Sequence, residues 1–359
     1  MSLREAQLQP DKILNTKLAV ETFNYYLPEK LIAQTPIEPR DQSRLMVLDR
    51  KNETILHRKF CDLPEFINQG DVLVFNDSKV ISARLYGYLV NNDRPVELLL
   101  LKQHEAGLWE SLVKPGRRMR EGAKFFVKNN KGKTLCGLVE AVLPEGTRLI
   151  RFQSGFDPEE YGELPLPPYI KEPVEDTNRY QTVYSKHLGS VAAPTAGLHF
   201  TEGLLQGIKD KSALIVYVTL HIGWDSFKPV KSEDFGDHVM HSEYWQISQD
   251  AANTINQAKK EGRRVISVGT TATRLLENAA DKNPHFKLNQ GEGWADIFIT
   301  PGYQFKVVDS LVTNFHLPKS TLLLLTSALG GKDFIFRAYE EAVKRDYRFY
   351  SFGDGMVIL

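Results

Sequence analysis

The amino-acid sequence predicts an α/β fold, in which an α/β domain carries an inserted small all-β barrel domain. Two observations support this prediction. From about residue 200 to the C-terminus, short apolar strands alternate with segments of helical spacing, as is typical of α/β domains. Between residues 80 and 151, short alternating runs about 8–12 residues apart are separated by Gly, Asn and Pro, which indicates a small barrel or sandwich. We therefore expect an N-terminal extension (1–22), a discontinuous α/β domain (23–79 and 152–359) and the inserted barrel domain (80–151).

The segment before the barrel contains two expected strands. Residues 23–49 are rich in Pro and charged side chains, which indicates irregular structure that ends in a short strand over residues 45–48. Residues 71–77, DVLVFND, form an apolar run followed by polar residues. A run of this kind predicts a buried strand with a turn at its end.

After an acidic, Pro-rich segment over residues 155–178, strands and helices alternate. The first expected helix has Ser248 or Asp250 as its N-cap and Gly262 as its stop, and Ser320 is the expected cap of a later helix. This order is typical of an open sheet covered by helices. The expected strands are ALIVYVTLHIG, RRVISVGTT, ADIFITPG and KVVDSLVTNF, and the expected helices are SQDAANTINQAKKEG, TRLLENAA, STLLLLTSAL and DFIFRAYEEAVKRD.

The composition is that of a globular protein of about two domains. Of its 359 residues, 42% are hydrophobic and 25% are charged, which excludes a disordered or fibrous chain. Lys plus Arg and Asp plus Glu number 45 each, and this net charge of zero by itself argues against nucleic-acid binding. The charges are unevenly distributed, however, because residues 114–128 carry a net +5 and residues 155–178 a net −6. The local distribution leaves a nucleic-acid partner open.

The sequence indicates a cytoplasmic protein without a membrane segment. Cys61 and Cys136 are too few for a disulfide framework, and neither belongs to a metal-binding pattern. The longest apolar stretch, residues 322–329, is shorter than the roughly 18 residues that a spanning helix needs. Glu5 and Asp11 stand where a signal peptide would be apolar, so we expect an N-terminal arm with no export function.

Two histidines are candidate catalytic residues. Residues 191–201 combine small residues, which let a ligand approach the backbone, with the polar side chains of Thr195 and His199. His221 ends the strand expected from Ala213. Ligands of open α/β sheets bind outside the carboxyl ends of the strands, where an acid or base is useful. A packing role is the alternative for both histidines.

Two segments that lead from a strand into a helix predict a polar binding site. The free N–H groups at the start of a helix bind carboxylates and phosphates well. The first segment lacks the spacing of a dinucleotide-binding motif or a P-loop, which argues against a dehydrogenase or an ATPase. Ordinary helix capping is the alternative for both segments. The candidate residues are Thr270, Thr271 and Arg274 in the first segment, and Asn314, His316 and Lys319 in the second.

A third group of residues has the spacing of metal ligands. His238 and His241 lie three residues apart and Glu243 follows them, as in some zinc sites. The surrounding sequence lacks the helical pattern that would place both histidines on one face, and such spacing is a frequent coincidence. A metal-dependent hydrolase built on these three residues is nevertheless an alternative function.

The positive charge of the barrel is concentrated in one segment. Lys114, Arg117, Arg118 and Arg120 lie within seven positions of one another. Such side chains contact phosphates and supply the part of nucleic-acid affinity that does not depend on base sequence. The segment is therefore a candidate nucleic-acid-binding surface, and a solvated run of charges is the alternative.

Long motifs, in order from about residue 23 to the C-terminus, resemble one known family. This family is the S-adenosylmethionine:tRNA ribosyltransferase-isomerases of queuosine biosynthesis. The resemblance covers nearly the whole chain. The motifs are LPEKLIAQ, RDQSRL, LVFNDSKVISARL, VKPGRR, ELPLPPYI, RYQTVYS, VAAPTAGLHFT, TLHIG, HSE, VGTTATR, FITPGYQFKVVDSLVTNFHLPKSTLLLL and YRFYSFGD.

The resemblance implies a cytoplasmic enzyme whose family fold agrees with the fold predicted above. Such an enzyme moves the ribosyl moiety of S-adenosylmethionine onto the 7-aminomethyl-7-deazaguanine wobble base of tRNA. It gives epoxyqueuosine-tRNA and releases adenine and methionine. S-adenosylmethionine is then a consumed substrate, and no separate cofactor is expected. The implied partner is tRNA that carries the deazaguanine precursor, and we expect a monomer or weak homo-oligomer without a membrane partner.

With this resemblance, His221 and His199 become candidates for the base and the acid, in either order. The substrate would contact Thr195 and the candidate residues of the two strand-to-helix segments. The basic segment of the barrel would contact tRNA. The departures from the family pattern include two features. Residues 1–21 precede its usual start, and Trp224 and Asp225 stand where a second glycine begins the usual sequence. A non-catalytic RNA-binding protein that uses the barrel is a further alternative.

Overall fold

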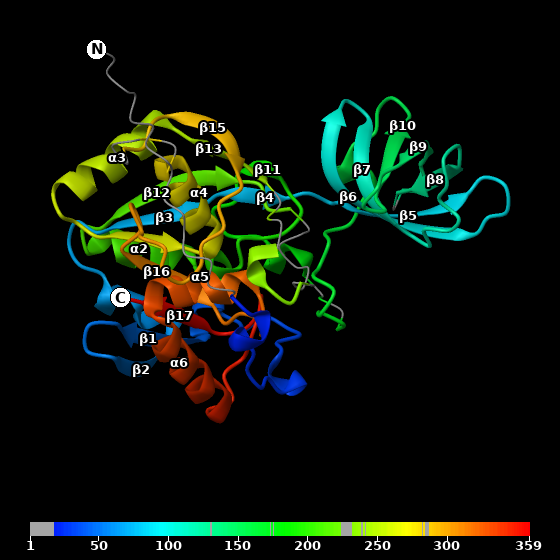
Figure 1. The fold of residues 1–359 in the computed structure, drawn as a ribbon. Coiled ribbons are helices and arrows are strands. Elements are labelled where there is room, and N and C mark those ends of the chain that lie inside the picture. The colour runs from blue at the N-terminus through cyan, green and yellow to red at the C-terminus, as the bar shows by residue number, and fades with distance from the viewer. Residues whose placement is uncertain are drawn as a thin grey trace, which may run out of the picture.

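The structure, a computed structural model, describes residues 18–129, 131–172, 174, 176–223, 232–237, 240, 242–281, 283 and 287–359. Figure 1 shows a large body of strands and helices and, to its right, a separate barrel. The body is a mixed α/β structure and the barrel is closed and antiparallel. The predicted fold class, an α/β domain with an inserted small barrel, is therefore confirmed.

In the described part of the chain, nine strands form the sheet of the body. Their spatial order is β15 (Gly291–Ala295), β13 (Glu243–Ile247), β12 (Leu214–Leu220), β3 (Val72–Asn76), β14 (Val265–Val268), β16 (Ser310–Asn314), β17 (Gly355–Ile358), β1 (Arg44–Asp49) and β2 (Thr54–Lys59). The four neighbours β12, β3, β14 and β16 run parallel. Parallel strands end at the same edge, so the segments that follow these four strands meet there.

The centre of the sheet is buried on both faces, because successive side chains of a strand point to opposite faces. In β3, Val74 packs in a cluster with α3 (Gln249–Lys260) and α4 (Thr270–Asp281). Phe75 points the other way and packs in a cluster with α2 (Glu202–Asp210). All five residues of β3 are buried, which explains why its sequence is continuously apolar.

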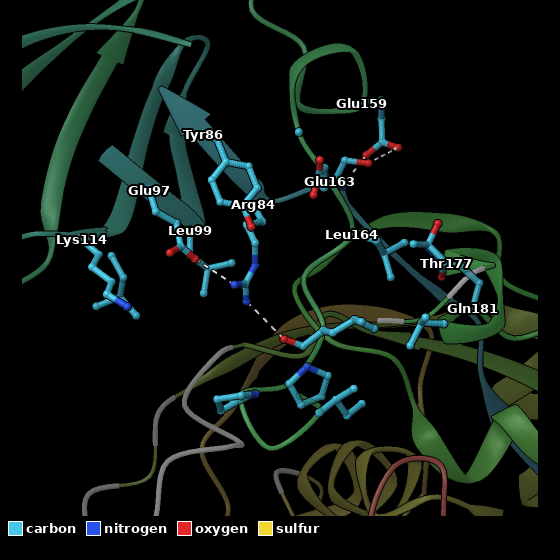
Figure 2. A pocket seen from close by; sticks show the side chains of 18 of the residues that line it. Arg84, Tyr86, Glu97, Leu99, Lys114, Glu159, Glu163, Leu164, Thr177 and Gln181 are labelled. Carbon is cyan, nitrogen blue, oxygen red and sulfur yellow. Dashed lines mark hydrogen bonds and ion pairs between the residues drawn. The ribbon is translucent and has the colours of Figure 1, made fainter. Parts of the chain in front are cut away.

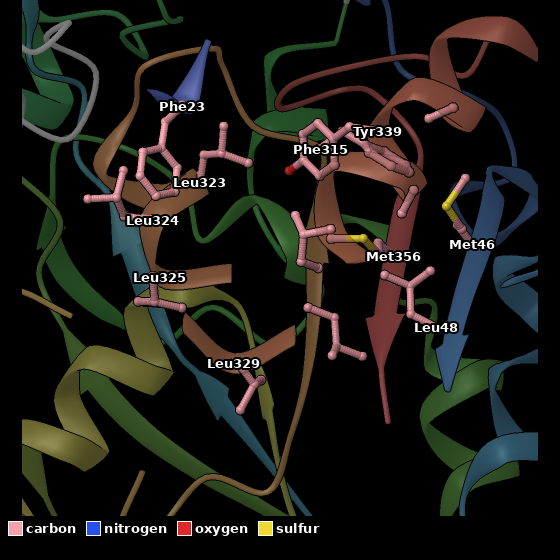
Figure 3. Packing of buried hydrophobic residues seen from close by; sticks show 14 of the residues in the cluster. Phe23, Met46, Leu48, Phe315, Leu323, Leu324, Leu325, Leu329, Tyr339 and Met356 are labelled. Carbon is pink, nitrogen blue, oxygen red and sulfur yellow. The ribbon is translucent and has the colours of Figure 1, made fainter. Parts of the chain in front are cut away.

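Two C-terminal helices, α5 (Thr321–Gly330) and α6 (Lys332–Lys344), pack against β16, β17 and β1, as Figure 3 shows. Leu324 of α5 and Met356 of β17 are fully buried in this cluster. Burying one such side chain contributes about 1.5–3 kcal/mol, so the most apolar stretch of the sequence forms core. Among the described residues, no helix is both long and apolar enough to cross a membrane.

The helix boundaries follow the local sequence. Ser248 Oγ accepts a hydrogen bond from the Ala251 N–H at the start of α3, and Ser320 Oγ accepts one from the Leu323 N–H at the start of α5, each at 3.2 Å. Gly262, just after α3, has a φ of 70°, a conformation that glycine adopts without strain. The predicted caps and the predicted stop are confirmed.

In the described residues, six strands close into the barrel. Around the barrel they are β10 (Arg148–Phe152), β7 (Leu108–Lys114), β6 (Pro95–Glu105), β5 (Arg84–Leu89), β8 (Lys124–Lys128) and β9 (Thr134–Val142). Phe125 fills the interior and is fully buried. A Cβ at Gly137 would lie 2.3 Å from the end of the Phe125 ring, so only glycine leaves room for it.

The barrel follows a short strand, β4 (Ser78–Val80), which pairs in parallel with β11 (His187–Ser190). This small sheet lies between the body and the barrel in Figure 1. It therefore brings the chain that enters the barrel next to a segment that follows the barrel in sequence.

One expected strand is wrong. ADIFITPG predicts a strand over residues 295–302, but β15 ends at Ala295 and residues 296–300 have no regular secondary structure. The strand lies instead on the sequence GEGWA, where Trp294 pairs with Tyr244 of β13. Backbone pairing with β13 decides its position, because a segment with two glycines carries no strand signal of its own.

Candidate functional site

Polar residues from neighbouring strands meet at the carboxyl edge of the sheet. Asn76, the last residue of β3, donates from Nδ2 to the Leu220 carbonyl (2.9 Å) and to Thr271 Oγ1 (3.3 Å). Its Oδ1 accepts from the Leu220 N–H (3.0 Å). This amide therefore joins the end of β12 to the start of α4, and so fixes the relative position of two segments that the sequence analysis selected separately.

A small cavity of about 60 Å³ lies between these segments. Of the residues selected from sequence, those that line it are Thr195, Thr270, Thr271, Arg274 and His316. Most of the remaining wall is small or apolar, and it includes Gly269 and Ile222. The volume suits one or two waters, whereas pockets for metabolite-sized ligands measure about 300–1,000 Å³. A ligand of that size must extend beyond these walls, and residues 224–231, which include Trp224 and Asp225, lie outside the described residues.

His221 lies just beyond the end of β12 and has an unused ring nitrogen. Its backbone N–H donates to the Tyr244 carbonyl (2.9 Å), and its ring stacks on the Tyr244 ring at 5.9 Å. The ring also packs against Gly189, where a Cβ would lie 2.7 Å from Cε1. Nδ1 is buried and has no hydrogen-bond partner among the described residues. Burial, and secondly the charge of His187, lower the pKa of His221, so the ring is neutral at pH 7 and can accept a proton.

His199 has both ring nitrogens occupied. Ser43 Oγ lies 2.7 Å from Nδ1, Asn314 Nδ2 lies 3.1 Å from Nε2, and the ring stacks on Phe60 at 4.5 Å. Because the Asn314 amide nitrogen is a donor, Nε2 accepts and the ring proton is on Nδ1, from which it reaches Ser43. Burial, followed by the charges of three arginines, lowers the pKa of His199 to about 3.

The contacts of His199 also fix the orientation of Asn314. Asn314 Nδ2 donates both to His199 and to the Tyr350 carbonyl (3.1 Å), an arrangement that the flipped amide could not make. Its Oδ1 is then buried without a hydrogen-bond partner in the described part of the chain. Buried polar atoms are rarely left unpaired, so this oxygen is a candidate acceptor for a ligand donor.

Arg274 binds a carboxylate of the protein itself. Its Nη1 forms a buried ion pair with Glu243 Oε2 of β13, and both side chains are less than a tenth exposed. Glu243 Oε1 in turn accepts from the Gly223 N–H (3.1 Å), two residues after His221. The pair therefore anchors the chain that follows His221. Arg274 also lines the small cavity, so its contact with a ligand stays a prediction.

Glu243 is also the third residue of the alternative metal site. The other two, His238 and His241, lie outside the described residues. Within the described residues, no group of three or more His, Cys, Asp or Glu side chains is arranged to hold a metal ion. With its two oxygens engaged by Arg274 and Gly223, Glu243 is held as a structural carboxylate.

The second predicted loop contributes one residue to the cavity wall. His316 is buried, its Nε2 lies 2.8 Å from Thr313 Oγ1, and burial lowers its pKa to about 3. Lys319 points elsewhere, because its Nζ pairs with Glu21 at 2.5 Å and it does not line the cavity. The expectation that Lys319 shares a crevice with His316 does not match this geometry.

Acidic pH is expected to destabilise the fold through His199 and His316. Each has a pKa of about 3 in the folded chain against about 6.5 when unfolded. Between these values the unfolded chain binds protons that the folded chain does not, so the free energy of unfolding falls as the pH drops below about 6.5. The slope is up to about 1.4 kcal/mol per pH unit for each histidine and ends near pH 3. Urea unfolding at several pH values measures this dependence of the free energy of unfolding on pH. If the slope stayed the same in a His199→Gln variant, the attribution of part of it to His199 would be contradicted.

Three arginines that the sequence analysis did not select surround His199. Arg40, Arg179 and Arg348 all act electrostatically on its ring. Burial and the nearby Arg179 lower the pKa of Arg40 to about 10, and Arg179 Nη1 is buried without a hydrogen-bond partner among the described residues. The sequence could have identified them, because they lie in three of the motifs that resemble the family, RDQSRL, RYQTVYS and YRFYSFGD. Burial, and after it this positive charge, keeps His199 neutral. Part of the charge is already balanced within the protein, because Arg179 forms an ion pair with Glu38.

The basic segment of the barrel forms an ordered, exposed loop. Lys114, Arg117, Arg118 and Arg120 are all exposed. Beneath them the buried Arg148 donates from Nε to the Met119 carbonyl (2.6 Å) and from Nη2 to the Gly116 carbonyl (2.9 Å). One buried guanidinium thus holds the loop in shape while the four cations face solvent.

A larger cavity of about 1040 Å³ separates the barrel from the body (Figure 2). Figure 2 shows Tyr86 and Lys114 on the barrel side and Gln181 on the opposite side. Arg84 spans it, because Nη1 binds Glu97 (2.8 Å) and Nη2 donates to the Leu166 carbonyl (3.3 Å). The acidic segment over residues 155–178 contributes part of the wall, including Glu159 and Glu163.

Comparisons with known proteins agree with the motifs. A family model described as "Queuosine biosynthesis protein" matches residues 20–358. The chain is 53% identical over 346 residues to S-adenosylmethionine:tRNA ribosyltransferase-isomerase of Halothermothrix orenii, a match that covers 95% of this chain and all of that relative. It is 52% identical over 340 residues to the protein of the same name from Clostridioides difficile, with 94% and 98% covered.

A solved structure supports the same relationship. The crystal structure of S-adenosylmethionine tRNA ribosyltransferase from Thermotoga maritima matches with a TM-score of 0.54 and 38% sequence identity. The match covers 94% of this chain and all of that chain. The motifs, the strand-edge site and the full-length identity of about 50% all lead to one conclusion: this chain belongs to the queuosine biosynthesis family of S-adenosylmethionine:tRNA ribosyltransferase-isomerases.

Proposed function

We propose that this enzyme moves the ribosyl moiety of S-adenosylmethionine onto the 7-aminomethyl-7-deazaguanine base of tRNA. The products are epoxyqueuosine-tRNA, adenine and methionine. Family membership supports the overall reaction. The location of the site is supported by strand topology, because His221, Asn314 and the start of α4 lie at the carboxyl ends of strands that run parallel in one sheet. S-adenosylmethionine is consumed in this proposal, no further cofactor takes part, and a tRNA substrate places the enzyme in the cytoplasm.

The reaction needs a base close to the sulfonium of S-adenosylmethionine. The positive sulfur acidifies the neighbouring 5′ carbon, and removal of one proton there gives an ylide. Adenine then leaves the sugar and takes up a proton, the amine of the modified base attacks the sugar, and epoxide closure expels methionine. We assign the proton removal to His221, because its ring is neutral and its buried Nδ1 has no partner among the described residues.

We assign His199 a positioning role, which revises its candidacy as acid or base. Both of its nitrogens are engaged within the protein, and protonation would place a fourth positive charge beside three arginines. Its Nε2 holds Asn314 so that the amide oxygen is left for the substrate. A His199→Gln variant, whose amide can replace one of these bonds, therefore retains more activity in this assignment than His199→Ala.

Adenine release tests the proposed function directly. The enzyme is mixed with S-adenosylmethionine and either tRNA that carries the precursor base or the same tRNA with guanine at the wobble position. Adenine release that requires the precursor tRNA supports the proposal. Absence of adenine release under all conditions contradicts it, and release without modification of the tRNA would indicate a hydrolase.

The rival functions gain no support from the site. The metal-dependent hydrolase requires Glu243 as a ligand, and this carboxylate is committed to Arg274 and Gly223. A non-catalytic RNA-binding protein has no use for the buried His221 Nδ1 and Asn314 Oδ1, which have no hydrogen-bond partner within the described residues. The same adenine-release measurement separates the latter from the proposed enzyme.

Charge reversal in the basic loop is expected to weaken tRNA binding. Arg117→Glu combined with Arg118→Glu removes exposed cations from an ordered loop, so affinity falls and its dependence on salt becomes shallower by about 0.7–0.9 in log–log slope per lost phosphate contact. Fluorescence titration of tRNA at several salt concentrations measures both quantities.

The matched control for this loop is Arg58→Glu. Arg58 is also exposed, but it lies on β2, at the end of the body away from the barrel in Figure 1. Arg58→Glu changes the net charge of the protein by as much as each of the two loop substitutions does. It should nevertheless affect tRNA binding little. Equal effects of the control and the loop variants would place the docking surface elsewhere.

A further inference from the structure

The outside of the barrel carries an aromatic and basic surface that the site described above does not use. β5 and β8 are paired neighbours, and Tyr88 stands opposite Phe126. Because side chains alternate along a strand, Tyr86 and Tyr88 of β5 share the outer face with Lys124, Phe126 and Lys128 of β8. We refer to these five residues as the aromatic face.

The three rings of the aromatic face are largely exposed. Tyr86 is 48% exposed, Tyr88 50% and Phe126 40%. Phe125 and Val127, on either side of Phe126 in β8, point inward and are fully buried. The barrel core is therefore complete without the outer rings. Contiguous exposed aromatic side chains are uncommon on a surface that contacts water alone, and they mark binding surfaces.

The free charges beside these rings are positive. Lys124 and Lys128 are exposed on the same strand as Phe126. The carboxylate opposite Tyr86, on β6, is Glu97, and it is already bound by Arg84 at 2.8 Å. Lysine is depleted in the interfaces between proteins, so the two lysines beside the rings favour a nucleic-acid partner over a second protein.

The aromatic face is continuous with the basic loop proposed to bind tRNA and with the large cavity between the barrel and the body. The basic loop leads directly into β8, and the Arg120 carbonyl accepts from the Ala123 N–H (2.9 Å) just before Lys124. Tyr86 also lines the large cavity between barrel and body, as Figure 2 shows. A single chain of nucleotides could therefore contact the loop, the rings and the cavity in turn.

We propose that the aromatic face binds unpaired nucleotides of the tRNA anticodon loop, with bases stacked on Tyr86, Tyr88 and Phe126 and phosphates near the two lysines. Aromatic side chains on a sheet surface bind single-stranded nucleic acid by stacking, and basic residues follow its backbone. The nucleotides next to the modified base are unpaired, so their faces are available. This inference rests on the proposed function, because it takes tRNA as the partner.

The test compares a double variant with matched controls. Tyr88→Ala combined with Phe126→Ala removes two rings and no charge, and neither ring supports the core. Tyr88→Trp retains a stacking surface, and Tyr26→Ala removes an 81% exposed ring that lies outside the barrel. Binding is measured with an anticodon stem-loop that carries the precursor base and with a fully paired RNA duplex of equal length, over a range of salt concentrations.

Stem-loop affinity should fall about 5- to 150-fold for each stacked base that is lost. Duplex affinity, the salt slope and S-adenosylmethionine binding should stay as in the wild type, and Tyr88→Trp and Tyr26→Ala should bind the stem-loop normally. Unchanged stem-loop affinity of the double variant, or an equal loss for the duplex, would overturn the inference. So would wild-type self-association that the double variant abolishes. Failure of the wild type to release adenine would instead refute the proposed function.

Discussion

Replacing His221 by Ala is expected to lower the rate of adenine release by about 10²–10⁴-fold, the usual contribution of a general acid or base. The affinity for S-adenosylmethionine should remain nearly unchanged, because the ring packs on Gly189 and Tyr244. Its Nδ1, which has no partner among the described residues, would act on one proton only. Steady-state adenine release measures the first effect, and calorimetric titration of S-adenosylmethionine measures the second.

Two further variants make this result specific. His104→Ala removes a histidine on the outside of the barrel and should leave adenine release unaffected. Gly189→Ala retains the His221 imidazole but introduces a Cβ that would lie 2.7 Å from it, so turnover should fall through displacement of the ring. Wild-type turnover in His221→Ala would remove this residue from the mechanism, and a parallel loss of substrate affinity would make it a binding residue.

Replacing Arg274 by Ala is expected to lower the free energy of unfolding by about 3–5 kcal/mol. The substitution leaves the buried carboxylate of Glu243 without its partner, and an unpaired buried charge is strongly destabilising. It also releases the anchor at Gly223, so adenine release should fall as well. Chemical denaturation, followed by the adenine-release measurement under folding conditions, gives both effects.

A double replacement separates the effect of an unpaired buried charge on stability from the effect of the lost Gly223 anchor on activity. Arg274→Met combined with Glu243→Leu removes both charges, so most of the lost stability should return while the Gly223 anchor remains absent. Arg337→Ala, which breaks an exposed pair with Glu53, should change stability by no more than about 1 kcal/mol. A similarly small effect of Arg274→Ala would show that the buried pair is not important for the fold.

The positions of the site segments could be predicted from the sequence because they depend on local rules. The apolar run of β3, the caps Ser248 and Ser320 and the strand–helix alternation all follow from neighbouring residues. Once parallel strands are expected, their carboxyl ends must share an edge. For this reason Thr195, Thr270 and other selected residues do line one cavity.

Local sequence was less informative where backbone pairing decides the position of a strand, or where a residue distant in sequence decides the contact of a side chain. The strand β15 lies on a polar segment with two glycines, and only β13 explains its position. Lys319 follows the same motif as His316 but pairs with Glu21, almost 300 positions earlier in the chain. No periodicity within the motif could have separated these two residues.

By itself the sequence determined the fold class and the family, and it predicted the edge of the sheet for the site, since these depend on periodicity, caps and long motifs. The tertiary structure decided which atoms remain available there. Ser43 and Asn314 occupy both nitrogens of His199 across more than 100 residues of chain, and Arg274 is neutralised by Glu243. His221 Nδ1 has no hydrogen-bond partner in the part of the chain that the structure describes. The physical reason is that a side chain's proton affinity and free hydrogen-bonding capacity are set by whatever folding packs around it, and those partners are distant in sequence.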